Sequence, residues 1–375
     1  MKKEKLLIYP YDGEFSPILR HKNLIENYNV VRLESPRGWG LTGRDGGEAD
    51  GGGYLGITVT SDFEKSLDLC DAILFSESRN QVDFDKFIMP KVISSIKRGK
   101  NIIFTIPLDC NTYNIILGEC EKGRVDFKYY GIPIDQEKSY KIDVNSEFLY
   151  NIDTPVIFVL GIGERTNKFE IQLALRENII KMGYNVIQIG TRGYCELLGF
   201  HSFPEFMYGG MLSETNKIAL FNHFIKKLET NEKPDVIIIG VPGGIIPFNN
   251  KLTNRFGVLA YEVSQAVTPD STVFSWYYEK YSTEYFNKMI DSIKYRLGCK
   301  VDCYNLTNVM FDWNNSRLEN KMLYISLDSK IVDTEKIRHK ELNISVFNVL
   351  NQKDAFDMAD CLIGKLREYG VAEYV

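Results

Sequence analysis

The sequence predicts an α/β fold with two doubly wound domains, Rossmann-like or P-loop-like, whose sheets are mainly parallel. Short apolar runs alternate with amphipathic helical stretches along the chain, which is the order expected of βαβ units. Several of the runs are apolar at every position, as is typical of parallel strands that helices cover on both faces. The alternation restarts after a polar stretch, so we expect one domain over 1–150 and a second over 151–375.

In the first domain, the apolar runs predict strands at 6–9, 29–33, 72–75 and 101–106. The stretches between them predict helices at 18–28, 63–70 and 84–98. The helix at 84–98 has apolar residues at a spacing close to the helical period. Gly99 follows it, as is typical of a helix end.

The second domain follows a mixed polar stretch over 135–153, where we expect the linker. Apolar runs then predict strands at 156–160, 185–189, 235–239, 272–276, 300–304, 322–325 and 345–349. Helices are expected at 167–182, 213–228, 284–297 and 355–369. This order again indicates right-handed βαβ units.

Composition and charge exclude several classes of protein. The 375 residues carry a formal net charge of −5, which disfavours a dedicated nucleic-acid-binding role because phosphate backbones attract basic surfaces. No segment approaches the roughly 18 apolar residues of a membrane helix, and the first apolar run stops at Pro10, too early for a signal peptide. Seven scattered cysteines, an odd number, suit reduced thiols. We therefore expect a cytoplasmic protein without a membrane partner.

The loop at 161–169 is the sharpest candidate for a ligand site. In open parallel sheets, ligands bind beyond the carboxyl ends of the strands, and this loop joins a buried strand to a long helix. Gly161 and Gly163 let the backbone approach an anion, while Arg165, Thr166 and Lys168 lie at the start of a helix whose first N–H groups need acceptors. We expect a nucleotide or another phosphorylated ligand here.

The same loop departs from the phosphate-binding pattern G-x-x-x-x-G-K-[ST]. The distance from Gly161 to Lys168 is one residue too long, Asn167 stands in place of the second glycine, and Phe169 replaces the magnesium-binding hydroxyl. The turn at 161–168 is thus a degenerate P-loop-like turn. We expect Lys168 at the surface, where its removal changes stability by no more than about 0.5 kcal/mol.

Two other interpretations of this loop stay open. As a dinucleotide fingerprint it has two of the three glycines, with Arg192 beyond the next strand in place of an acid, which would suit a 2′-phosphate. The loop is alternatively a tight turn without a ligand, capped by Thr166 or Asn167.

A second loop, Gly-Val-Pro-Gly-Gly-Ile-Ile-Pro at 240–247, follows the strand at 235–239. In a P-loop protein that hydrolyses its nucleotide, we expect an acid at this strand end to hold magnesium, and here Gly240 stands there instead. Gly243 and Gly244 free the backbone to line a ligand cleft beside the first loop. A plain tight turn is the alternative.

A third loop, rich in glycine over 38–56, follows the second strand. Trp39 is placed to stack on a ring of a ligand, and Arg37 to pair with a carboxylate or phosphate. The glycines favour a mobile lid or binding loop; a flexible surface loop is the alternative. No residue pair has a spacing that identifies acid–base, nucleophilic or metal chemistry, so we assign no catalytic residues and no metal ligands.

Five segments share their pattern with a known family: IYPYD at 8–12, PILRH at 17–21, SPRGWG at 35–40, GIGERTNKF at 161–169 and PGGI at 242–245. The chain resembles the clostridial peptide-maturation-system proteins, which occur with bacteriocin-type, cysteine-rich precursor peptides and a radical SAM maturase. The resemblance implies an accessory or modifying role in peptide maturation, with the precursor peptide and the maturase as partners. It supplies no reaction. The alternative is a stand-alone NAD(P)-dependent oxidoreductase, or an atypical P-loop NTPase or kinase.

Overall fold

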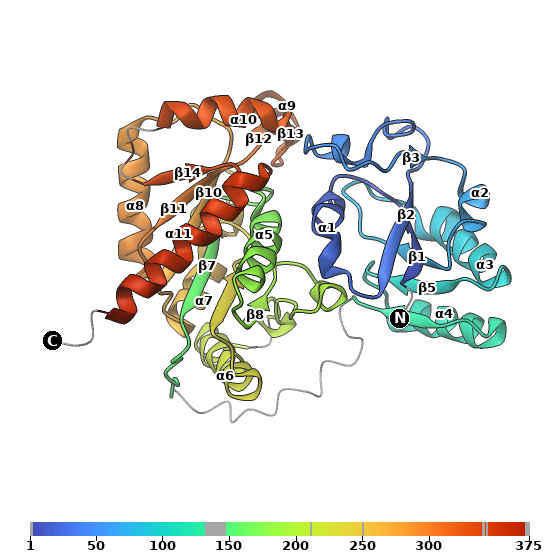
Figure 1. The fold of residues 1–375 in the computed structure, drawn as a ribbon, viewed down its shortest axis with the longest axis horizontal. Coiled ribbons are helices and arrows are strands. Elements are labelled where there is room, and N and C mark those ends of the chain that lie inside the picture. The colour runs from blue at the N-terminus through green and yellow to red at the C-terminus, as the bar shows by residue number, and fades with distance from the viewer. Residues whose placement is uncertain are drawn as a thin grey trace. The chain divides into compact units, whose positions relative to one another are not determined.

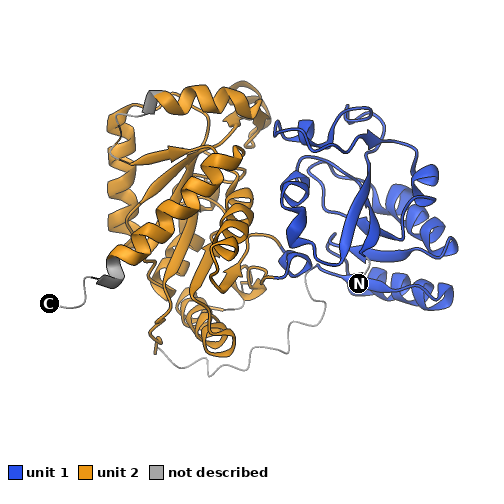
Figure 2. Ribbon diagram, viewed as in Figure 1, with its two compact units in different colours: residues 1–141, 193–199 blue, residues 142–192, 200–375 orange. Residues whose placement is uncertain are grey.

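The computed structural model describes residues 3–131, 148–210, 212–249, 251–339, 342 and 344–371. The chain divides into two compact units, 1–141 with 193–199, and 142–192 with 200–375 (Figure 2). The linker expected at 135–153 lies mostly outside the described residues, so its position stays a prediction. Residues 193–199 belong to the first unit, which differs from a single boundary near residue 150.

Unit 1 is built on a six-stranded parallel sheet of order β3-β2-β1-β4-β5-β6 (Figure 1). Its strands are β1 (Glu4–Tyr9), β2 (Tyr28–Glu34), β3 (Val59–Thr60), β4 (Ala72–Phe75), β5 (Asn101–Phe104) and β6 (Phe127–Tyr129). Its α-helices are α1 (Ser16–Arg20), α2 (Phe63–Leu67), α3 (Met89–Lys97) and α4 (Cys110–Gly123). This is the 3-2-1-4-5-6 order of dinucleotide-binding folds, in which strand order reverses beside the first strand.

One face of this sheet packs against α2, α3 and α4. The core there joins alternate residues of β1, β4 and β5 to helix residues such as Leu67, Val92 and Ile116. Because successive strand residues point to opposite faces, this alternation fixes which side of the sheet the helices cover.

Unit 2 contains a second six-stranded parallel sheet, of order β14-β11-β10-β7-β9-β8. Its strands are β7 (Val156–Gly161), β8 (Val186–Ile189), β9 (Val236–Gly240), β10 (Ser271–Trp276), β11 (Cys303–Leu306) and β14 (Ser345–Phe347). An antiparallel hairpin is formed by β12 (Val309–Phe311) and β13 (Tyr324–Ser326). The α-helices are α5 (Lys168–Lys181), α6 (Glu214–Glu232), α7 (Val258–Ala266), α8 (Thr283–Leu297), α9 (Trp313–Glu319), α10 (Ser329–Glu335) and α11 (Gln352–Val371).

Helices cover both faces of the second sheet. Ile157 and Val159 of β7 pack with α5 and α11, whereas Phe158 and Leu160 pack with α6, α7 and α8. All six residues of β7 are buried, as expected of a central strand covered on both sides. Two mainly parallel α/β sheets confirm the fold class, Rossmann-like and P-loop-like, that the sequence predicts.

The structure corrects one predicted element and adds others. The helix expected over 18–28 is wrong: α1 ends at Arg20, and a 3₁₀ turn at Lys22–Leu24 follows. After α1 the chain must return to the level of Glu4 at the start of β1, because Glu4 pairs with Tyr28. Extended chain advances further per residue than an α-helix, so a shorter non-helical segment spans the distance between Arg20 and Tyr28. The sequence did not predict β3, α4, β6, α7, β12, α9 or α10. Within the described part of the chain, no helix combines the length and apolarity needed to cross a membrane.

Candidate functional site

The loop between β7 and α5 has the backbone form of an anion-binding nest. Arg165 and Asn167 both have left-handed backbone, with φ of 58° and 56°, and they flank Thr166. Among the described residues, the backbone N–H groups of residues 163–167 have no acceptor in the protein. Successive N–H groups in such a conformation line a concavity that suits an anion. The 14-residue helix α5 begins directly afterwards and adds the positive end of its dipole.

Lys168 is buried beneath this loop, with a relative exposure of 6%. Its ammonium donates hydrogen bonds to the carbonyl oxygens of Gly163 and Gly243, each at 2.6 Å. Burial lowers the pKa of Lys168 to about 7; Glu164 opposes this shift and Arg192 adds to it. No carboxylate of the described residues lies at ion-pair distance. The expectation of a surface lysine is therefore wrong, because the side chain folds inward to carbonyls of two loops.

Both glycines of the first loop are required by close packing. A Cβ on Gly161 would collide with Oγ1 of Thr166, and a Cβ on Gly163 would collide with the hydroxyl of Tyr277. That hydroxyl donates a 2.6 Å hydrogen bond to the carbonyl of Glu164. Neither glycine has a positive φ, so steric contact, rather than backbone freedom, explains them.

The side chains of Thr166 and Arg165 both have partners within the protein. Thr166 is fully buried, and its hydroxyl donates to the carbonyl of Gly163 at 3.1 Å. Its own carbonyl accepts from Ser275 Oγ at 2.5 Å. The guanidinium of Arg165 lies 5.2 Å from the ring centre of Tyr324 on β13. Thr166 thus stabilises the loop, and Arg165 flanks it.

The second predicted loop lies against the first. Gly243 supplies a carbonyl to Lys168, and a Cβ on Gly244 would collide with the amide of Asn254. Asn254 Nδ2 donates to the carbonyls of Ile162 and Ile246, at 2.8 and 2.9 Å. The structure thus brings Gly161, Gly163, Arg165, Thr166, Lys168, Gly243 and Gly244 into one cluster.

Asn254 was missed because nothing in its local sequence marks it. It opens a run of four residues, 254–257, that all have positive φ. Such a run is costly for residues with a Cβ, and the two hydrogen bonds of the Asn254 amide hold its first residue in place. The contact spans 92 residues, beyond the reach of a motif.

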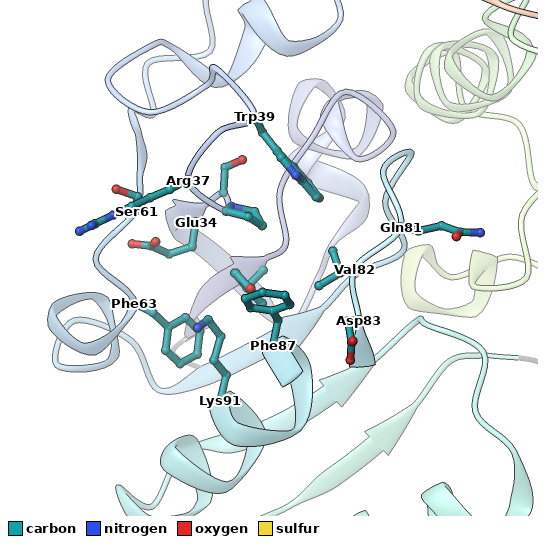
Figure 3. Close-up of a pocket in the computed structure, with 13 residues that line it drawn as sticks. Glu34, Arg37, Trp39, Ser61, Phe63, Gln81, Val82, Asp83, Phe87 and Lys91 are labelled. Carbon is teal, nitrogen blue, oxygen red and sulfur yellow. The ribbon is translucent and has the colours of Figure 1, made fainter. Parts of the chain in front are cut away.

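A cavity of about 440 Å³ lies at the carboxyl ends of β1, β2 and β3 in unit 1. It is lined by Tyr9, Glu34, Ser35, Pro36, Arg37, Trp39, Ser61, Phe63, Gln81, Val82, Asp83, Phe87 and Lys91. The two predicted residues Arg37 and Trp39 both belong to this wall. Figure 3 shows Trp39 on one side of the cavity and Phe63, Phe87 and Lys91 on the other.

Glu34 and Lys91 are among the ionisable residues of this cavity that were not predicted. Glu34 ends β2, is 1% exposed, and accepts hydrogen bonds from the hydroxyls of Thr60 and Ser66. The ammonium of Lys91 lies 5.1 and 5.0 Å from the ring centres of Tyr9 and Phe63. An acid at the carboxyl end of the second strand was the available signal for Glu34.

The glycine-rich loop is held by one carboxylate. Asp45 accepts backbone hydrogen bonds from Gly47, Leu55, Gly56 and Ile57, at 2.7–3.1 Å. These bonds tether 47 and 55–57 to Asp45, and a mobile lid over 38–56 stays a prediction. Arg37 and Trp39 precede this tethered part.

No protein-family model matches the chain, and neither does any curated protein. The crystal structure of a DUF1611 family protein from Anabaena variabilis is 12% identical, with a TM-score of 0.61 over 96% of this chain and 100% of that one. Cobyrinic acid a,c-diamide synthase from Mycobacterium smegmatis, with bound ADP and magnesium, is 13% identical over 57% of this chain and 96% of that chain, with a TM-score of 0.34. The first likeness shows the fold alone.

Proposed function

We propose that unit 2 binds a nucleotide through its phosphates at the β7–α5 loop. The observation that carries this proposal is the buried ammonium of Lys168, which has two carbonyl partners and no carboxylate. Burying an unpaired charge is costly. An anion in the nest would supply the missing negative charge.

The chemistry of binding follows from the loop. Unpaired N–H groups of residues 163–167 would donate to the phosphate oxygens. The ammonium of Lys168 would exchange its carbonyl partners for a phosphate oxygen, the role of lysine in phosphate-binding loops. Before a phosphate binds, the carbonyls of Gly163 and Gly243 hold the ammonium beside the nest.

Two residues favour binding over hydrolysis. Phe169 stands where a magnesium-binding hydroxyl is expected and is buried in the core. Gly240 stands at the end of β9, and the side chain of Gln172 fills the space that its Cβ would need. We therefore propose that the nucleotide is held as an effector or structural ligand.

Titration calorimetry with ATP, GTP and NADPH tests this proposal. Lys168→Met keeps most of the side-chain volume and should weaken binding about 10- to 150-fold, as expected for hydrogen bonds to charged groups. Lys181→Met is the matched control, because Lys181 lies at the other end of α5 with its side chain 62% exposed. Equal binding by Lys168→Met and Lys181→Met, or no binding by the parent, would refute a nucleotide site.

The role in peptide maturation is a finer proposal that rests on the residue patterns alone. It predicts a gene for a short cysteine-rich peptide and a radical SAM gene beside the gene of this protein. The purified chain should then bind that peptide in a fluorescence anisotropy titration. A gene neighbourhood without either gene would contradict this role and leave the nucleotide site unaffected.

A further inference from the structure

We propose that the cavity of unit 1 is a second ligand site, which takes a small organic anion that carries a planar ring. This site is independent of the nucleotide site proposed for unit 2. Its volume of about 440 Å³ lies within the range of roughly 300–1,000 Å³ typical of small-molecule pockets. Its place at the carboxyl ends of β1, β2 and β3 is where open parallel sheets bind ligands.

Two cations of the cavity, Arg37 and Lys91, can take part in binding an anion. Both acids on its wall are used by donors of the protein: Glu34 accepts from Thr60 and Ser66, and Asp83 accepts the backbone N–H of Lys86 at 2.9 Å. Among the described residues, no carboxylate lies at ion-pair distance from Lys91 or Arg37. Neither cation of the wall is held in an ion pair with a described residue, so both are available to an anionic group of a ligand, beside the charges of Glu34 and Asp83 on the same wall.

The aromatic side chains favour a ring between the walls. Trp39 is partly exposed and faces the group formed by Phe63, Phe87 and Lys91 across the cavity (Figure 3). Phe87 is 45% exposed, so its ring is available for contact. Stacked or edge-to-face contacts with these rings would orient a planar ligand. The ammonium of Lys91, over two rings, is placed to pair with an acidic group on that ligand.

A buried hydroxyl gives an independent indication of a ligand. Ser35 is 2% exposed, lines the cavity, and its Oγ has no hydrogen-bond partner. Buried hydroxyls are nearly always satisfied in folded proteins. Rotation of this hydroxyl into the cavity would let a polar group of a bound ligand satisfy it.

Titrations of the full chain carrying Lys168→Met test the site with the unit 2 lysine removed. AMP and indole-3-acetate are the probes, because they combine a planar ring with a phosphate and a carboxylate, respectively. We expect at least one of them to bind, and the stronger one identifies the acidic group. Adenosine lacks the acidic group and inorganic phosphate lacks the ring, so each should bind at least tenfold more weakly.

Variants in the same background assign the binding to the cavity. Lys91→Gln and Trp39→Ala should each weaken the bound probe at least tenfold. Lys97→Gln, on the exposed side of the same helix α3, should leave it unchanged, and circular dichroism should show the same fold for all three. Failure of both AMP and indole-3-acetate to bind, or equal affinities of the Lys91→Gln and Lys97→Gln variants, would overturn the proposal.

Discussion

Lys168 couples anion binding to pH at the scale of a single residue. Its pKa is about 7 without an anion because burial disfavours the charged form. A bound anion raises that pKa, so binding takes up a proton above pH 7. We predict that the affinity for sulfate, which stays a dianion between pH 6 and about 9, falls by up to about tenfold per pH unit above 7.

Calorimetric titration of sulfate from pH 6 to about 9 measures this dependence. The Lys168→Met variant should bind weakly and with no such slope. A parallel decline in both proteins would assign the pH dependence to another group.

The same lysine predicts a pH-dependent stability. Its pKa falls on folding from the ordinary 10.5 to about 7, so the unfolded chain binds more protons between these values. The free energy of unfolding of the parent should therefore rise with pH across that window, by up to about 1.4 kcal/mol per unit. In urea denaturation, the free energy of unfolding of the parent should increase relative to that of Lys168→Met as pH rises. A difference independent of pH would contradict the buried position.

Close packing at Gly163 gives a paired prediction. Gly163→Ala places a methyl group against the Tyr277 hydroxyl and should lower the free energy of unfolding by about 1–3 kcal/mol. Tyr277→Phe removes that oxygen, so the double variant should recover part of the loss. Urea denaturation of the single and double variants measures the coupling; strictly additive losses would show that the two groups do not touch.

The residues singled out around the β7–α5 loop lie together in the structure, but their orientation was not predictable from the sequence. Two glycines and a lysine at a strand–helix junction were enough to predict an anion loop, because that junction needs only local backbone. Buried Lys168 donates to the Gly243 carbonyl, 75 residues away along the chain. The hydrogen bond from the Asn254 amide to the Ile162 carbonyl spans 92 residues. Short sequence motifs cannot predict contacts between residues so far apart along the chain.

At the scale of elements, Asp45 organises the loop between β2 and β3. Asp45→Ala removes the acceptor of four backbone hydrogen bonds. We expect a loss of about 2–4 kcal/mol in unfolding free energy, since several donors lose a charged acceptor together. Hydrogen exchange of the amides of 55–57 should accelerate strongly. Unchanged exchange at these amides would contradict the tether.

The predictable elements were those with a clear apolar pattern. Strands such as β4 and β7 were predicted because their apolar runs are continuous and bounded. By contrast, α4 buries only Ile116 and Cys120, which leaves no apolar stripe to recognise. Nine-residue α7 is short and apolar, so periodicity does not separate it from a strand.

At the scale of the whole molecule, unit 1 is completed by a segment from the second half of the chain. Residues 193–199 belong to it, and the Tyr194 ring lies 6.0 Å from that of Phe15. Tyr194 is 1% exposed, so Tyr194→Ala should destabilise unit 1 by about 3–5 kcal/mol, as for other large aromatic truncations.

Hydrogen exchange followed by mass spectrometry measures this effect unit by unit. Peptides of β1 and β4 should exchange faster in Tyr194→Ala, because the loss belongs to unit 1. Tyr295→Ala is the control, since Tyr295 is 79% exposed and surface changes usually stay within about 0.5 kcal/mol. Faster exchange confined to unit 2 would contradict the assignment of this segment.

In the proposed nucleotide site, the β7–α5 loop holds the phosphates on its free N–H groups and Lys168. Backbone amide NMR of the nitrogen-labelled chain during an ATP titration tests it most directly. The amide signals of residues 163–167 should shift saturably in the parent and in Lys181→Met, and in Lys168→Met the same shifts should need about 10- to 150-fold more ATP. Saturable binding that leaves these amides unshifted, or that shifts them at the same ATP concentrations in Lys168→Met, would rule out this phosphate site.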